Sequence, residues 1–263
     1  EGRELFDPAF FAISPKNAVL MDPQARLLLK HAWLALEDAG YTPGALPDTA
    51  VFMAASHSFY KTLLHTSGAV APGDAYAAWI AGQGGTIPTM ISYQLGFTGP
   101  SLAVQSNCSS SLVALHLAHQ AIETGEARCA LVGAASLFAL PGAGHVFQPG
   151  MNLSRDGRLK AFDGAADGLV GGEGVAVVLV KRACDAVRDG DHIYALVRGV
   201  AVNNDGASKV GSVFVYVLVA TVGLNMNIAA VLESPVYFVI GGVWMLVHVA
   251  LMFGMAFLIR SPS

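Results

Sequence analysis

Charged residues and cysteines are scarce in this chain of 263 residues. Asp, Glu, Lys and Arg supply only 13% of it, the net charge is −4, and no basic run alternates with aromatic residues. The sequence therefore gives no indication of a nucleic-acid-binding surface. The cysteines are odd in number and have no metal-ligand spacing, so they predict neither a disulfide framework nor a metal site. The three cysteines are Cys108, Cys129 and Cys184. Unpaired cysteines of this kind indicate a reduced, cytoplasmic compartment.

A signal peptide is also missing. The first four residues are polar, no initiating Met is present and no apolar core follows. Since a secretory signal needs such a core, we expect a chain that begins inside a domain.

Apolar residues, in contrast, are abundant and unevenly distributed. The mean hydropathy is +0.52, and residues 210–232 and 237–259 each form a run of 23 residues without charge. A membrane-spanning helix needs about 20 mostly apolar residues, so the tail predicts one or two spans. Lys209 and Arg260 flank the two runs, which would place both ends in the cytoplasm. Asn225 and Asn227 interrupt the first run, so a buried strand with a loop is an alternative there.

Before this tail, short apolar runs alternate with helical patterns. Buried strands that alternate with helices favour an α/β layered domain with a central mixed sheet. We expect helices over residues 22–40 and 86–95 and after Cys108, and strands over residues 49–54, 101–104, 130–136, 174–180 and 193–202.

Cys108 stands where the apolar run 101–104 gives way to one of these helical patterns. The N-terminus of a helix presents free N–H groups and the positive end of a dipole, and both favour thiolate over thiol. Cys108 is therefore a candidate nucleophile. We expect Leu112, Leu115, His119 and Ile122 to form the buried stripe of the helix that follows.

The other candidate groups have simpler interpretations. His116 and His119 would project along that helix, away from the sulfur, and His248 would be a packed histidine rather than a proton relay. His145 is the one histidine that could approach a pocket from a loop. Cys129 lies in an apolar run, so we expect it to be buried. The glycine-rich segments 82–85 and 142–144 lack the Lys-Ser/Thr of a phosphate loop, so we expect them to form turns.

Four stretches resemble the β-ketoacyl synthase domain of modular polyketide synthases. The nucleophile motif corresponds to SNCSSSLVALHLA at 106–118, with Ser106-Asn107 where many relatives have Thr-Ala. The other three are FDPAFFAISPKNAVLMDPQARLLLKHAWLALEDAGYTP at 6–43, GRLKAFDGAADGLVGGEGVAVVLVKR at 157–182 and VRGVAVNNDGAS at 197–208. The resemblance covers residues 1–209.

The resemblance implies a thiolase fold, in which two related α/β halves pack as five layers, and a decarboxylative Claisen condensation of polyketide or fatty-acid type. Cys108 would accept an acyl chain from the phosphopantetheine arm of an acyl carrier protein, with no cofactor bound directly. Malonyl-type thioesters would be the second substrate, and the intact family forms homodimers. Lys160, Asp167 and Glu173 would lie near the pocket floor in structural ion pairs, and Asn204 and Asp205 would form a turn.

The resemblance also implies what is missing. The two histidine motifs that drive decarboxylation and a glycine-rich loop of the oxyanion hole do not occur in the 263 residues. We therefore expect an incomplete thiolase-like fold over residues 1–209, with condensation lost. The tail, 210–263, follows without a linker, and its residues 213–262 resemble part of an uncharacterised family of multi-spanning bacterial membrane proteins. The alternative is a non-catalytic chimeric membrane protein that carries an inactive ketosynthase remnant.

Overall fold

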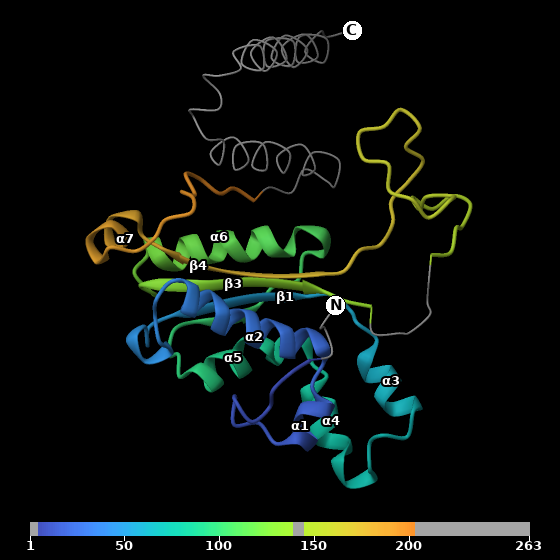
Figure 1. Cartoon of the computed structure of the whole chain (residues 1–263), viewed down its shortest axis with the longest axis horizontal. Helices are drawn as coiled ribbons and strands as arrows, with labels where there is room; N and C mark the ends of the chain where they lie inside the picture. Colours follow the sequence, from blue (N-terminus) through green and yellow to red (C-terminus); the bar gives the residue numbers. More distant parts are fainter. Residues whose placement is uncertain (1–4, 139–144, 203–263) are drawn as a thin grey trace, which may run out of the picture. The chain divides into compact units, whose positions relative to one another are not determined.

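The structure, a computed structural model, describes residues 5–138 and 145–202 of the chain (Figure 1). The strands are β1 (Ala50–Ala55), β2 (Ser101–Ala103), β3 (Cys129–Ser136) and β4 (Gly174–Lys181). The α-helices are α1 (Pro15–Leu20), α2 (Pro23–Asp38), α3 (Tyr60–Thr66), α4 (Ala75–Ala81), α5 (Ile87–Leu95), α6 (Ser110–Glu123) and α7 (Ala183–Asp189). Short 3-10 turns are η1 (Pro43–Ala45), η2 (Pro72–Asp74), η3 (Gly84–Thr86) and η4 (Asn107–Ser109).

The four strands form one mixed sheet in the order β2-β1-β3-β4. β1 runs parallel to both β2 and β3, whereas β3 and β4 are antiparallel. Phe52 in the centre of β1 is in register with Leu102 on one side and Val132 on the other. The predicted α/β class and the first four predicted strands are therefore confirmed.

Helices cover both faces of this sheet (Figure 1). On one face, α2 packs on β3 and β4 while α5 packs on β1 and β2, and on the other face α6 packs on β1 and β3. Each face has its own apolar core. Because β1 is covered on both sides, its apolar residues Ala50–Ala54 are all buried.

The helix boundaries follow capping chemistry. The Asp22 carboxylate accepts a hydrogen bond from the Gln24 N–H at 2.8 Å, and Pro23 occupies the first position of α2. Gly96, with φ of +71°, ends α5 in the left-handed conformation that glycine adopts without strain. Both predicted boundaries are confirmed.

The predicted buried stripe of α6 is wrong in most of its members. Ser110, Ala114, Ala118 and Ala121 face the sheet, and of the predicted stripe only Ile122 is fully buried. Small side chains let the helix backbone approach the sheet closely. Leu112, Leu115 and His119 are half-buried, and Leu115 still packs against the edge of this core.

The predicted strand over residues 193–202 is also wrong, because this stretch pairs with no strand in the described part of the chain. Tyr194 is 69% exposed and Val202 53%, so the run is not a buried strand. A strand needs a hydrogen-bonded neighbour and an apolar surface to cover, and residues 194–197 belong to a second compact unit of the chain instead.

The two predicted membrane spans, 210–232 and 237–259, lie outside the described residues, as does His248. Within the described ranges, no helix is both long enough and apolar enough to cross a bilayer.

Candidate functional site

Cys108 lies in the turn η4, between the end of β2 and the start of α6. The structure thus confirms the predicted strand-to-helix junction and adds a 3-10 turn that precedes the α-helix. The thiol is exposed. Among the described residues, the Cys108 N–H has no hydrogen-bond partner, so it remains available as a donor. An exposed thiol beside a free backbone donor is the arrangement that a cysteine nucleophile needs.

The residue before the cysteine has an unusual backbone. Asn107 has φ of +53°, in the left-handed region, which few residues other than glycine adopt. Asparagine is among the residues that tolerate it best. This single left-handed residue turns the chain out of β2 and into η4, so that the next side chain is presented at the surface.

The junction is tied to the carboxyl ends of the parallel strands. Gln105 Nε2 donates to the Ala55 carbonyl oxygen at the end of β1, at 2.7 Å. The side chain of Gln24, which is 1% exposed, donates to the Ser56 carbonyl oxygen at 2.7 Å and accepts from the Leu137 N–H at 3.2 Å. Ligand sites of open α/β sheets lie at this edge, and Cys108 lies at the same edge.

The histidines in the described ranges do not pair with Cys108. No described residue makes a hydrogen bond to the Cys108 sulfur, although His116 and His119 belong to the helix that follows it. His31 Nδ1 contacts the Leu27 carbonyl oxygen of its own helix at 2.8 Å. His145 Nε2 contacts the Ser154 carbonyl oxygen at 2.5 Å, so it holds the loop between β3 and β4.

Lys160 and Asp167 of that loop form the predicted structural ion pair, whereas Glu173 makes a hydrogen bond to the backbone. Lys160 Nζ lies 3.0 Å from Asp156 and 3.4 Å from Asp167. The hydrogen bond from Lys160 lowers the pKa of Asp156 to about 2. Glu173 accepts a hydrogen bond from the Phe138 N–H at 2.8 Å, which fixes the loop to the end of β3. Asn204 and Asp205 lie outside the described residues.

The other two cysteines differ in environment. Cys129 is 1% exposed, and burial raises the pKa of its thiol although a contact with Thr49 Oγ1 at 3.2 Å opposes this. Cys184 is exposed on the short helix α7. The prediction of a buried Cys129 is confirmed.

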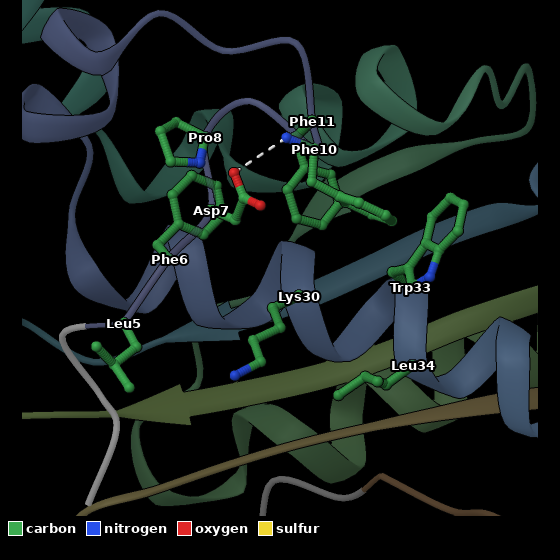
Figure 2. A pocket seen from close by; sticks show the side chains of 9 residues that line it. All are labelled: Leu5, Phe6, Asp7, Pro8, Phe10, Phe11, Lys30, Trp33 and Leu34. Carbon is green, nitrogen blue, oxygen red and sulfur yellow. Dashed lines mark hydrogen bonds between the residues drawn. The ribbon is translucent and has the colours of Figure 1, made fainter.

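Two hollows are present on the surface, and none of the three cysteines lines either of them. The larger, of about 630 Å³, lies between the segment that precedes α1 and the helix α2, and aromatic rings line it (Figure 2). Phe10 meets Trp33 edge to face, with 4.9 Å between ring centroids. The smaller, of about 170 Å³, lies at the carboxyl edge of the strands, and Gln24 and Gln105 line it. The hydrogen bonds of Gln24 and Gln105 were not predicted from the sequence, since a single glutamine gives no local pattern.

Comparisons with known proteins assign most of the chain to one family. Residues 1–186 match the family described as beta-ketoacyl synthase, N-terminal domain. Residues 193–262 match a second family, described as a protein of unknown function (DUF819). The chain is 58% identical over 214 residues to the polyketide synthase PksN of Bacillus subtilis, which covers 80% of this chain and 4% of PksN. It is 48% identical over 211 residues to the polyketide synthase GfsA of Streptomyces halstedii, which covers 80% of this chain and 3% of GfsA.

Solved structures agree with the fold. Ketosynthase twelve of the bacillaene polyketide synthase from Bacillus amyloliquefaciens is 56% identical with a TM-score of 0.73, over 79% of this chain and 36% of that one. The ketosynthase from module 1 of the same organism's bacillaene synthase is 53% identical with a TM-score of 0.69, over 79% of this chain and 37% of that one. The chain thus spans about a third of the length of these ketosynthases and shares their thiolase-like fold. On these matches and on the strand-to-helix junction at Cys108, this chain belongs to the β-ketoacyl synthase family.

Proposed function

We propose that Cys108 accepts an acyl chain from the phosphopantetheine arm of an acyl carrier protein. The observation that carries this proposal is the exposed thiol beside a backbone N–H that has no hydrogen-bond partner among residues 5–138 and 145–202, in a chain of the β-ketoacyl synthase family. Acyl transfer of this kind needs no metal and no bound cofactor, because sulfur both attacks the carbonyl carbon and later leaves it.

The transfer has a simple balance. The Cys108 thiol gives up its proton, and its sulfur forms a bond to the thioester carbonyl carbon. The bond from that carbon to the pantetheine sulfur breaks, and the departing thiolate takes up a proton. Negative charge develops on the carbonyl oxygen during this step, and the free Cys108 N–H donates to it.

We further propose that this chain loads an acyl group and does not extend it. Extension requires a malonyl-type thioester to lose carbon dioxide, after which its carbanion attacks the acyl carbon and the Cys108 thiolate leaves. The family carries out this step with two histidines, whose motifs do not occur in the sequence. No histidine in the described ranges makes a hydrogen bond to the Cys108 sulfur, which supports loading as the limit of its chemistry.

The experiment is to incubate the full chain with a short acyl-N-acetylcysteamine thioester and to measure its intact mass. We expect a gain of one acyl group, its loss in Cys108→Ser and its retention in Cys184→Ser, because Cys184 is also exposed but lies on α7. Malonyl carrier protein is then added and the products are analysed. A β-ketoacyl product would contradict the loss of extension, while an unchanged mass in the first step would contradict loading.

The apolar tail favours a second candidate function. The charge-free runs 210–232 and 237–259 support a membrane anchor, with the ketosynthase part in the cytoplasm as a remnant joined to an unrelated membrane protein. Expression of the full chain in bacteria followed by alkaline carbonate extraction tests this proposal. The chain should stay in the membrane pellet, and its release into the supernatant would contradict the anchor. Amplification of genomic DNA across codon 209 tests whether the junction is natural.

A further inference from the structure

The turn that carries Cys108 is closed by serine hydroxyls. Ser110 Oγ accepts a hydrogen bond from the Ser106 N–H at 2.9 Å and donates to the Asn107 carbonyl oxygen at 2.7 Å. Ser109 Oγ donates to the Ser106 carbonyl oxygen at 2.7 Å. The Ser110 hydroxyl therefore bridges Ser106 and Asn107, the two residues that are joined by the peptide bond preceding the left-handed position.

Ser110 differs from its neighbours because it is anchored. It is 7% exposed and belongs to the face of α6 that packs on the sheet, together with Ala114 and Ala118. Ser111, the next residue, is exposed, and its hydroxyl makes no hydrogen bond within the described part of the chain. Ser110 thus links the turn to the core, whereas Ser111 offers a matched control.

The turn has a conformation that needs such a link. Left-handed conformations of residues other than glycine are disfavoured, although asparagine tolerates them better than most, and they persist where their surroundings hold them. Asn107, with φ of +53°, is exposed, so its side chain is not enclosed by the core. The hydroxyl of Ser110, which accepts from one side of Asn107 and donates to its carbonyl, supplies the restraint.

We propose that Ser110 is a positioning residue, whose hydroxyl holds the Asn107 turn so that the Cys108 sulfur and N–H face an incoming thioester together. The proposal rests on the acyl-loading function proposed above and identifies what orients its nucleophile. Ser110 itself does not touch the acyl group. Its effect should therefore appear in reactions that require orientation and not in those that require only an accessible thiol.

The test compares two reactions of Cys108 in the full chain with Cys184→Ser as background. Acylation by an acyl-N-acetylcysteamine thioester needs sulfur and N–H in one geometry, while alkylation by iodoacetamide needs the sulfur alone. We expect Ser110→Ala to slow acylation about 10- to 100-fold, as misplaced reacting groups do, and to change alkylation by less than about twofold. Ser111→Ala should react like the unmodified background in both assays.

A second variant keeps the proposal testable if Ser110→Ala does not fold. Asn107→Val places a β-branched residue at the left-handed position, where it is strongly disfavoured, and Asn107 is exposed. It should slow acylation and preserve alkylation in the same way, while Asn107→Gly should retain both. Equal losses in the two reactions, or acylation of Ser110→Ala and Asn107→Val at the Ser111→Ala rate, would overturn the positioning role. If the background chain is alkylated at Cys108 and never acylated, the loading function fails, and this inference fails with it.

Discussion

Lys181 donates a hydrogen bond to the Asp191 carboxylate at 2.7 Å, and only 9% of the lysine side chain is exposed. The same ammonium lies 2.6 Å from Asp189 and 3.0 Å from the Tyr41 hydroxyl, which itself donates to Asp191 at 2.5 Å. These four groups join the end of β4 to the loops after α2 and α7. Burial alone would lower the pKa of Lys181, but these hydrogen bonds outweigh it and raise that pKa.

Lys181→Met should therefore destabilise the protein by about 2 kcal/mol, because it leaves the partly buried Asp191 carboxylate without its cation. Urea unfolding followed by circular dichroism measures the change. Lys16→Met is the control, since the Lys16 side chain is 65% exposed in its ion pair with Asp74 and such pairs contribute little. Equal effects of the two substitutions would contradict the importance of burial at Lys181.

The same cluster predicts a dependence of stability on pH. The hydrogen bond from Lys181, followed by that from Arg188, lowers the pKa of Asp189 to about 2. A carboxyl whose pKa is depressed by folding stabilises the folded state above its unfolded pKa of about 4, and this contribution is lost as the pH falls toward the folded value. The urea midpoint of the natural chain should exceed that of Asp189→Asn by a constant amount from pH 7 to 5, and this difference should shrink below pH 4. An advantage independent of pH would contradict this assignment.

The backbone at Gly99 lies so close to the backbone at Thr49 and Ala50 that a methyl group added at Gly99 should destabilise the fold. A Cβ at Gly99 would lie 2.6 Å from the Thr49 carbonyl oxygen and 2.8 Å from the Ala50 nitrogen, where the chain enters β2. Because backbone atoms cannot move aside as a flexible side chain can, Gly99→Ala should cost about 1–3 kcal/mol. Gly44→Ala is the control, since nothing lies within 4 Å of its added Cβ. A Gly99→Ala variant as stable as the control would show that β2 adjusts freely.

The cysteines should differ in reactivity toward iodoacetamide in the native state. Cys108 and Cys184 are exposed, whereas Cys129 is 1% exposed and burial raises the pKa of its thiol. Since the thiolate is the reactive form, peptide mapping should find alkylation at the two exposed cysteines and none at Cys129 until urea unfolds the chain. Rapid native labelling of Cys129 would contradict the packing of β3 against Thr49.

The features that the sequence predicted well are those encoded within a few neighbouring residues. Asp22 with Pro23, and Gly96, each determine a helix end through their own backbone and side-chain chemistry. The apolar runs of β1 and β3 likewise predict strands by themselves. Cys108 was found in the same way, because a strand-to-helix junction and a family motif coincide there.

The features that the sequence did not predict depend on partners far along the chain. The buried stripe of α6 is built mainly of small residues, Ser110 and three alanines with Ile122 at its end, whereas the apolar pattern pointed to larger ones. The close packing of the helix on the sheet favours the small side chains. The Lys181–Tyr41 contact joins residues 140 apart in the sequence. The left-handed Asn107 had no signal either, because asparagine tolerates that conformation without requiring it.

Locating the acyl group on the protein tests most directly whether Cys108 is the loading site. The full chain is incubated with an acyl-N-acetylcysteamine thioester, digested at mildly acidic pH to preserve thioesters, and analysed by tandem mass spectrometry. We expect an acyl group on Cys108, with Cys129 and Cys184 unmodified. An acyl group on Cys184 in place of Cys108, or no acyl group on any cysteine of a folded chain, would contradict the assignment of Cys108 as the loading site.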